Sequence, residues 1–388
     1  MYDADYARRH VLEQVLPFWR RHSVDTIEGG FMTCLDRRGD VYDTAKPAAM
    51  NARMVFAFSI GHELDPGGGH LDLARHGVDF LERTWDREHG GWPNLSNRDG
   101  SVREHGKRLF TQAYVLYGLA HYARVAEDGA LLERLVDFYD LVEARAWDPV
   151  HSGYYASCNP DWSVKTDWKT ICVQLDFMKV VHVLHELTGD SRFADRMSEL
   201  ADLVAFRMRD PRRGAVLEYF HRDWRYHPEP RRDTLELGHN LKAVRWLLET
   251  GDPRYLEAAQ ETLAFALTRG WDERHGGFWQ HLRRSGRLAA KEKEWWAECE
   301  GLWALLLMHR ETGDPVLLDR AQELMRFCFT HFADPEHGDW YMSCRRDGRP
   351  ADERKGGIYK AAYHVVDACM APISLLAREP SRAAAALA

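Results

Sequence analysis

The 388-residue sequence lacks several features that mark particular classes of protein. It has no run of about 18 apolar residues, so no membrane-spanning helix is indicated. Residues 1–20 are charged from the outset and have no apolar core, so we expect a first helix there and no secretion signal. Lysine and arginine, at 52, are outnumbered by 60 aspartates and glutamates, and the net charge of −8 argues against a nucleic-acid partner.

Paired cysteines are missing as well. The seven cysteines are scattered and no Cys-x-x-Cys motif occurs, so neither a disulfide framework nor a zinc site is indicated. We therefore expect reduced thiols and a cytoplasmic location. Aromatic residues, in contrast, make up 12% of the chain and include 14 tryptophans. Rings with a polar edge can line carbohydrate pockets as well as hydrophobic cores.

One short signature recurs six times along the chain. It consists of an aspartate, a few polar residues, one or two glycines and usually an aromatic residue, as in Asp25 to Phe31 and Asp86 to Trp92. The six aspartates stand at positions 25, 86, 148, 210, 272 and 334, so the intervals are 61 once and 62 four times. A constant period of this length indicates a repeat architecture.

A second mark keeps the same interval. Thr188-Gly-Asp190, Thr250-Gly-Asp252 and Thr312-Gly-Asp314 each follow an apolar run with helical spacing. Glycine suits the end of one helix, and aspartate, followed by proline in two cases, suits the start of the next. The predicted unit is therefore helix, tight turn, helix and β-hairpin, and six units give twelve helices.

Twelve helices in such units could form an open solenoid or a closed ring. An open solenoid needs polar capping repeats at its ends, whereas the sixth repeat here is as complete as the others. We therefore predict one domain over residues 1–388, an all-α (α/α)6 barrel with short β-hairpins at one mouth. The alternation of glutamate and lysine at residues 291–294 is typical of a solvated face.

The inner helices of this ring should start where the hairpins end, so polar side chains at their starts should converge on a pocket. Positions about 26 to 30 beyond each aspartate hold Asn51, Arg53, Gln112, Asp176, His239, Glu298, Glu300, Tyr363 and His364. Polar groups buried at such positions are costly unless they bind something. For any single histidine the alternative is a helix cap or a satisfied core group.

These residues resemble the N-acylglucosamine 2-epimerase family, which includes cellobiose 2-epimerases and isomerases of mannose and sulfosugars. The matching blocks are residues 29–43, 51–53, 107–114, 238–239, 293–300 and 355–364, in order over nearly the full length. The resemblance implies the (α/α)6 fold and a small free sugar as substrate. It also implies a 2-epimerase or aldose–ketose isomerase that works through a cis-enediol(ate), with neither a metal nor a cofactor, and often as a homodimer.

The resemblance also assigns roles. His239 and His364 would be the acid and base on either side of the sugar, a task that imidazole can perform near neutral pH. Arg53 would stabilise negative charge on the carbonyl oxygen. Glu300 would hold a hydroxyl or orient a histidine. The rest of the expected substrate-binding set is Asn51, Gln112, Asp176, Trp296, Glu298 and Tyr359, with Trp296 and Tyr359 packing on the sugar.

Three places depart from the family pattern. Lys242 stands where a glutamate usually follows the first histidine, and Asp367 stands where an arginine often follows the last. The third-repeat helix reads Cys172 to Asp176 where relatives place histidine and asparagine. A cation at 242 disfavours an imidazolium at His239, unless the lysine points elsewhere or an acid such as Glu218 or Glu236 compensates.

Two other functions stay open. A glycoside hydrolase or lyase on the same ring would need two carboxylates beside the glycosidic bond, and Asp176 with Glu300 could supply them. A non-catalytic sugar-binding relative also stays open, because of Lys242 and Asp367. Within the first hypothesis, epimerisation and isomerisation both remain open, because they differ only in whether the proton returns to C2 or to C1.

Overall fold

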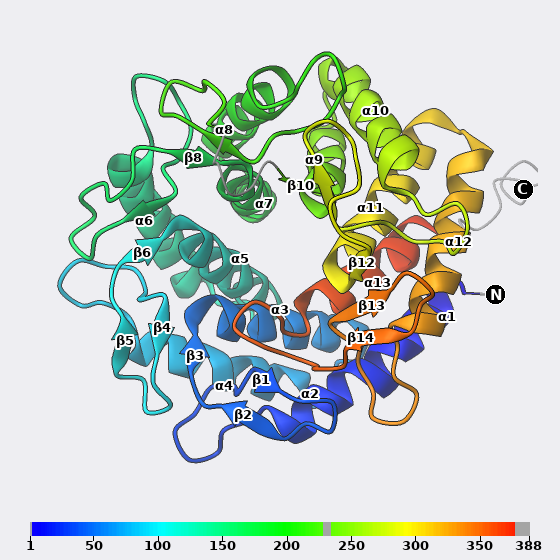
Figure 1. Ribbon diagram of the computed structural model, residues 1–388. Coiled ribbons are helices and arrows are strands. Elements are labelled where there is room, and N and C mark those ends of the chain that lie inside the picture. The colour runs from blue at the N-terminus through cyan, green and yellow to red at the C-terminus, as the bar shows by residue number, and fades with distance from the viewer. Residues whose placement is uncertain (1, 228–233, 377–388) are drawn as a thin grey trace, which may run out of the picture.

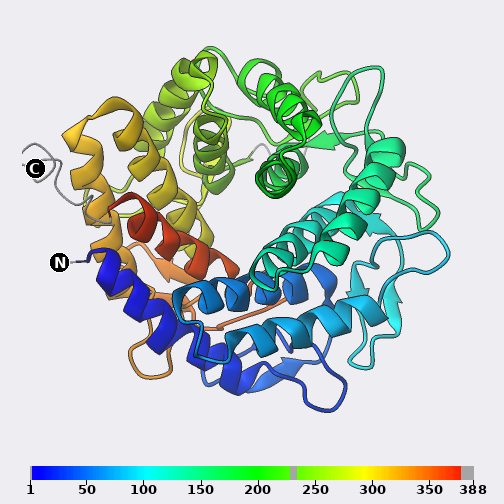
Figure 2. The same ribbon diagram turned by 180° about the vertical axis from the view of Figure 1, so that it is seen from behind.

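The computed structural model describes residues 2–227 and 234–376, which form two concentric rings of helices (Figures 1 and 2). The inner ring contains α3 (Ala48–Leu64), α5 (Leu109–Val125), α7 (Ile171–Thr188), α9 (Leu237–Glu249), α11 (Trp295–Thr312) and α13 (Tyr363–Leu375). The outer ring contains α1 (Ala4–His10) continued by η1 (Val11–Val15) and α2 (Leu16–His22), α4 (His70–Arg83), α6 (Gly129–Ala146), α8 (Ser191–Asp202) with η2 (Leu203–Arg207), α10 (Leu256–Phe265) between η3 (Pro253–Tyr255) and η4 (Ala266–Gly270), and α12 (Pro315–His331). The predicted barrel of twelve helices is confirmed.

The two rings differ in their burial pattern. Every residue of α3 is buried except His62 and Glu63, because an inner helix packs against two neighbours and an outer helix. In α4 the buried residues recur at helical spacing, as Ala74, Val78 and Leu81 do, and the opposite face is polar. A helix that is apolar all round is thus placed inside, and an amphipathic helix is placed outside.

Short antiparallel strands join neighbouring repeats at one mouth of the barrel. They are β1 (Cys34–Leu35), β2 (Val41–Asp43), β3 (Lys46–Pro47), β4 (Leu95–Ser96), β5 (Val102–Glu104), β6 (Lys107–Arg108), β7 (Ser157–Cys158), β8 (Lys169–Thr170), β9 (Tyr219–Phe220), β10 (Thr234–Glu236), β11 (His281–Arg283), β12 (Glu292–Glu294), β13 (Ser343–Arg345) and β14 (Pro350–Asp352). Each of β3, β6, β8, β10 and β12 pairs with a strand of the next repeat and ends directly before an inner helix. The mouth with the strands is therefore the mouth at which these inner helices begin.

The signature aspartate organises each turn. Asp25 accepts the backbone N–H groups of Ile27 and Glu28 at 3.1 and 3.2 Å and the ammonium of Lys46 at 2.8 Å. The same ion pair, with a spacing of 21 residues, recurs as Lys107–Asp86, Lys169–Asp148, Lys293–Asp272 and Lys355–Asp334. The expectation of a solvated face at residues 291–294 is wrong for Lys293. Its side chain is fully buried and forms this ion pair with Asp272.

An arginine from the next repeat completes this arrangement and closes the ring. Arg98 of the second repeat binds Asp25 of the first, with both distances at 2.9 Å. Arg37 of the first repeat binds Asp334 of the sixth in the same way, with its Nε at 2.9 Å. Trp19 adds a hydrogen bond of 3.2 Å to Asp339. The first and last repeats are thus joined as neighbours, which makes the architecture a ring and not an open solenoid.

The tight turns between the helices follow their sequence signature. Gly189 and Gly313 end α7 and α11 in the left-handed region, with φ of 69° and 71°. Asp190 and Asp314 then cap the next helix with their side chains, as predicted.

Two expectations from composition can be compared with the structure. Among residues 2–227 and 234–376, no helix combines the length and the apolar character needed to cross a bilayer. All seven cysteines are unpaired, and all but Cys172 are buried.

Candidate active site

Three residues expected to bind substrate instead hold the turns onto the inner helices. Asn51 accepts the N–H of Phe31 at 2.7 Å and donates to its carbonyl at 3.4 Å. Gln112 binds Trp92 in the same way, at 3.0 and 2.8 Å. Glu298 accepts the N–H of the corresponding aromatic residue, 20 positions earlier, at 2.9 and 3.0 Å. All three side chains are fully buried, and their polar atoms are engaged by these turns.

The sequence contained a signal for this role. Gln174 follows Tyr154 by the same 20 residues and binds its N–H and carbonyl at 2.9 and 2.8 Å. A carboxamide donates and accepts at once, which matches a peptide group. Glu298 differs from the three carboxamides because its side chain is a carboxyl group. Burial raises the pKa of Glu298 to about 8, so this carboxyl is largely protonated at neutral pH and can also donate a hydrogen bond.

His239, in the first turn of α9, is held by two carboxylates. Its Nδ1 lies 2.8 Å from Oε2 of Glu218 and 3.8 Å from Oε2 of Glu236. Burial by itself lowers the pKa of an imidazole, but the charge of Glu218, hydrogen bonds to Cys172 and Glu218, and the charge of Glu236 raise the pKa of His239 well above 6.5. His239 is therefore protonated at neutral pH.

His364, in the first turn of α13, has the opposite environment. Its side chain is buried, and its Nδ1 lies 3.6 Å from Oε1 of Glu300, beyond hydrogen-bond length. Burial lowers the pKa of His364 well below 6.5, and the positive charges of Arg53 and Lys179 lower it further. His364 is therefore neutral, and its environment and that of His239 shift the two pKa values in opposite directions.

Trp296 lies close to both imidazoles. Its ring centroid is 5.1 Å from that of His239 and 6.1 Å from that of His364. The indole packs directly on Gly238, where a Cβ would come within 2.3 Å of the ring. Its Nε1 donates to Glu294 at 2.9 Å, which fixes its orientation. A partly exposed indole face beside two histidines is suited to packing on a sugar ring.

Arg53 is held in place without an anionic partner. Its Nη1 donates to the carbonyl of Tyr359 at 2.7 Å, and its guanidinium lies 3.9 Å from the ring centroid of Tyr114. In the part of the chain that the structure describes, Arg53 forms no ion pair within 4.0 Å, and its Nε has no hydrogen-bond partner. Tyr359 itself is 55% exposed. The charge of Arg53 is therefore available to an oxyanion.

The unexpected Lys242 pairs with an aspartate of α7. Its ammonium lies 2.5 Å from Asp176, which also binds Lys179 at 3.2 Å. Asp176 is fully buried and is neutralised by these two lysines, so the structure does not leave it free for a sugar hydroxyl. The two possibilities raised by the sequence both hold: the lysine points elsewhere, and Glu218 compensates at His239.

Asp367, the second departure, also has a buried partner. Its carboxylate binds the guanidinium of Arg245 at 2.5 and 3.2 Å. Sequence reasoning missed Arg245, Lys179 and Tyr114 as neighbours of the candidate site. Arg245 and Lys179 fall three residues after Lys242 and Asp176, so charges one helical turn apart in otherwise apolar helices were the available signal.

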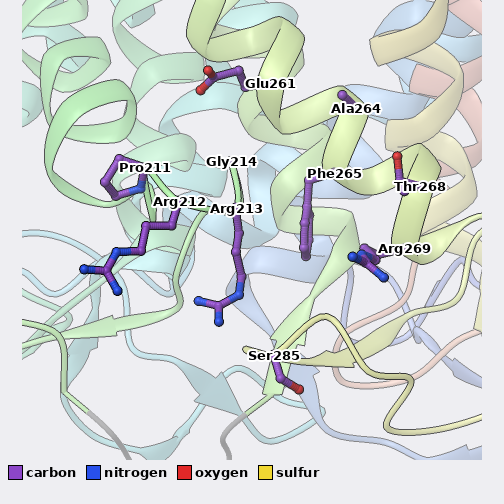
Figure 3. A pocket seen from close by; sticks show the side chains of 10 residues that line it. All are labelled: Pro211, Arg212, Arg213, Gly214, Glu261, Ala264, Phe265, Thr268, Arg269 and Ser285. Carbon is purple, nitrogen blue, oxygen red and sulfur yellow. The ribbon is translucent and has the colours of Figure 1, made fainter.

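Within residues 2–227 and 234–376, no three His, Cys, Asp or Glu side chains are placed to hold a metal ion. A surface hollow of about 420 Å³ lies between the turn after Asp210 and α10 with η4, lined among others by Arg213, Glu261 and Phe265 (Figure 3). Arg213 already pairs with Asp210 at 3.0 Å and Glu261 with Arg209, so the hollow gathers few unpaired groups.

The chain is similar to known proteins over almost its whole length. A family model described as N-acylglucosamine 2-epimerase (GlcNAc 2-epimerase) matches residues 29–368. The N-acylglucosamine 2-epimerase of Mus musculus is 27% identical, covering 91% of this chain and 87% of the relative. The cellobiose 2-epimerase of Bacteroides fragilis is 23% identical, covering 92% and 95%.

Solved structures give the same result for the fold. The cellobiose 2-epimerase from Spirochaeta thermophila superposes with a TM-score of 0.87 at 26% identity, covering 96% of each chain. A D-mannose isomerase superposes with a TM-score of 0.88 at 20% identity, covering 95% of this chain and 97% of the other.

Proposed function

Since the chain belongs to the N-acylglucosamine 2-epimerase family, and is thereby an enzyme of the epimerase and isomerase class, we propose that it interconverts a free sugar with its C2 epimer or with the corresponding ketose. The observation that carries the proposal is the pair of imidazoles near Trp296, one neutral and one protonated. Proton removal and proton delivery need these two states at the same pH.

The proposed reaction starts with the open-chain aldose. Neutral His364 takes the proton from C2, and the electron pair moves toward the carbonyl oxygen to form a cis-enediolate. Arg53 stabilises the negative charge on that oxygen, since within the described residues its guanidinium forms no ion pair and its Nε is unpartnered. Protonated His239 then delivers its proton to the opposite face of C2, which gives the epimer. If the hydroxyl proton on O2 first moves to O1, His239 delivers its proton to C1 instead, which gives the ketose.

The glycosidase alternative is less well supported. It needs two carboxylates with separate roles on either side of a glycosidic bond. Asp176 binds Lys242 and Lys179 at 2.5 and 3.2 Å and is fully buried. The case for a non-catalytic relative is also weaker, since Lys242 and Asp367 pair with other buried groups and leave both histidines in place.

Hydrogen exchange tests this proposal directly. The protein is incubated in D2O with a panel of free aldoses and ketoses, and NMR follows deuterium at C1 and C2. We expect incorporation with at least one sugar, and its loss in His239→Ala and His364→Ala. His185→Ala, at the far end of α7, is the matched control and should retain exchange. Cleavage of a glycoside without exchange would instead indicate a hydrolase, and neither reaction would indicate a binding protein.

A further inference from the structure

The proposed reaction depends on the spacing between two helices that a third helix separates. His239 lies on α9 and His364 on α13, and α11 stands between these helices in the inner ring (Figure 1). The two carbons that can receive the returning proton, C2 and C1, are about 1.5 Å apart. A displacement of about 1 Å at the reacting atoms can change a rate by about 100-fold. Contacts that fix α9 relative to α13 therefore affect both the rate and the product.

A buried ion pair joins these two helices directly. Arg245 of α9 binds Asp367 of α13 through two bonds, with Nη1–Oδ2 at 2.5 Å and Nη2–Oδ1 at 3.2 Å, and both side chains are only 6% exposed. Asp367 follows His364 by three residues, which is about 4.5 Å along α13. Arg245 follows His239 by six residues, which is about 9 Å along α9. The pair thus lies farther from the mouth than the two histidines.

The intervening helix is held at the same point. The ring centroid of Trp303, on α11, lies 3.9 Å from the guanidinium carbon of Arg245. The indole Nε1 of Trp303 donates to the backbone carbonyl of Asp367 at 3.0 Å. Arg245, Asp367 and Trp303 therefore join α9, α11 and α13, the three helices on which the candidate acid, the indole beside both imidazoles and the candidate base lie.

The chemistry of this cluster suits it to fixing a geometry. A buried ion pair often adds little net stability, because the cost of desolvating both charges offsets their attraction. A guanidinium bound to two carboxylate oxygens is nevertheless directional, and stacking on an indole restricts it further. An apolar pair could fill the same space, but it would leave the helices freer to slide and rotate.

We propose that Arg245, Asp367 and Trp303 are positioning residues that set the spacing of α9 and α13 and thereby decide how the returning proton is divided between C2 and C1. None of the three takes part in proton transfer. Arg245 and Asp367 hold the outer two of these helices together, and Trp303 ties the helix between them to the same point. This inference rests on the proposed function.

Replacing both charges by apolar side chains tests this role. Arg245→Met/Asp367→Leu removes the two ion-pair bonds, keeps the space filled and leaves the net charge of the interior unchanged. Turnover in D2O is followed by NMR with a sugar that the wild type converts, which gives kcat, KM and the deuterium at C2 and at C1 of the products. We expect kcat to fall about tenfold with KM changed less than about twofold, and the share of the minor product to rise about threefold or more.

Two further variants complete the experiment. Arg124→Met/Glu63→Leu is the matched control, because this ion pair of 2.6 Å joins the far ends of α5 and α3, and its loss should leave kcat and the product ratio unchanged. Arg245→Lys keeps the charge but not the two-bond geometry. It should shift the product ratio in the same direction, and it keeps the test decisive if the apolar double variant does not fold in chemical denaturation.

The outcomes are distinct. A folded apolar variant with the kcat and product ratio of the wild type overturns the inference, and so does an unchanged ratio in Arg245→Lys. A lower kcat at an unchanged ratio also overturns it, because loss of active protein lowers kcat without redirecting the proton. If the wild type converts no sugar, the proposed function itself fails, and this inference fails with it.

Discussion

Glu298 offers the most direct test of how the repeats are held together. It occupies the position of Gln112 and Gln174, and its carboxyl binds the N–H of Phe278 at 2.9 and 3.0 Å. Burial raises its pKa from 4.5 to about 8, against smaller opposing effects of that hydrogen bond and of Lys293. The folded protein therefore keeps a proton on Glu298 that the unfolded chain loses above pH 4.5.

The sign of the stability change follows from this difference. A group whose pKa is raised on folding gives its full contribution below the unfolded pKa, and that contribution is lost as pH rises through the folded pKa. For a pKa raised from 4.5 to about 8, the free energy of unfolding falls by about 5 kcal/mol between these two pH values, as an order of magnitude. Glu298→Gln removes the titration and keeps the donor and acceptor.

Chemical denaturation at pH 4.5, 6, 7 and 8 measures the effect. The variant should differ least from the wild type at pH 4.5 and should become increasingly the more stable of the two toward pH 8. Gln112→Glu is the converse control, because it places a carboxyl in an equivalent, fully buried clamp, and its stability should fall with rising pH. A constant difference between Glu298→Gln and wild type over this range would refute the reasoning, since it would mean that Glu298 is ionised in the fold.

Two further predictions concern the site and the ring. The pH profile of kcat/KM should be broad, because His364 sets its acid limb well below pH 6.5 and His239 sets its alkaline limb well above pH 6.5. Glu218→Gln should move the alkaline limb to lower pH, because it removes a charge that raises the pKa of His239. An unmoved alkaline limb in that variant would contradict the role of the carboxylate. Arg37→Ala should destabilise the fold by about 1–3 kcal/mol in denaturant unfolding, because it removes the ring-closing partner of buried Asp334; no change would mean that the last repeat is held without it.

The overall fold could be predicted because its information is periodic. Six aspartates at 61- or 62-residue intervals predict the number of repeats. Errors in the helix or strand boundaries within one repeat do not change that number. The cross-repeat strand pairs could not be predicted in the same way. Strands of two or three residues, such as β3 and β4, are too short to show an alternating pattern, and their pairing depends on where the next repeat lies.

The site could be predicted only in part, because the positions 26 to 30 after each aspartate lie on more than one face of the inner helix. Residues two apart on a helix point in different directions. Asn51 and Arg53, or Glu298 and Glu300, therefore separate: the first of each pair clamps a turn, and the second lies among the candidate site residues. Position 28 after the aspartate, which holds Arg53, Tyr114, Asp176 and Glu300, would have been the better guide in those four repeats.

The partners of the departing residues were beyond sequence reasoning for another reason. Lys242 meets Asp176 across 66 positions, and Asp367 meets Arg245 across 122. The sequence around Lys242 or Asp367 does not show whether the residue has a buried partner or marks a loss of function. The tertiary arrangement of the inner helices brings the members of each pair together.

The recurring aspartate–lysine pair has a consequence for measurement. The same two charged groups, at the same separation of 21 residues, pair five times within one chain with ammonium–carboxylate distances of 2.6 to 3.2 Å, and every carboxylate except that of Asp86 is buried. Comparisons of ion pairs between proteins always change composition, solvent and fold together. Here those variables are shared, and only the immediate neighbours differ. The molecule thus contains an internal set of replicates, in which the scatter among five equivalent lysine substitutions would measure how far local surroundings alone set the energy of a buried charge pair.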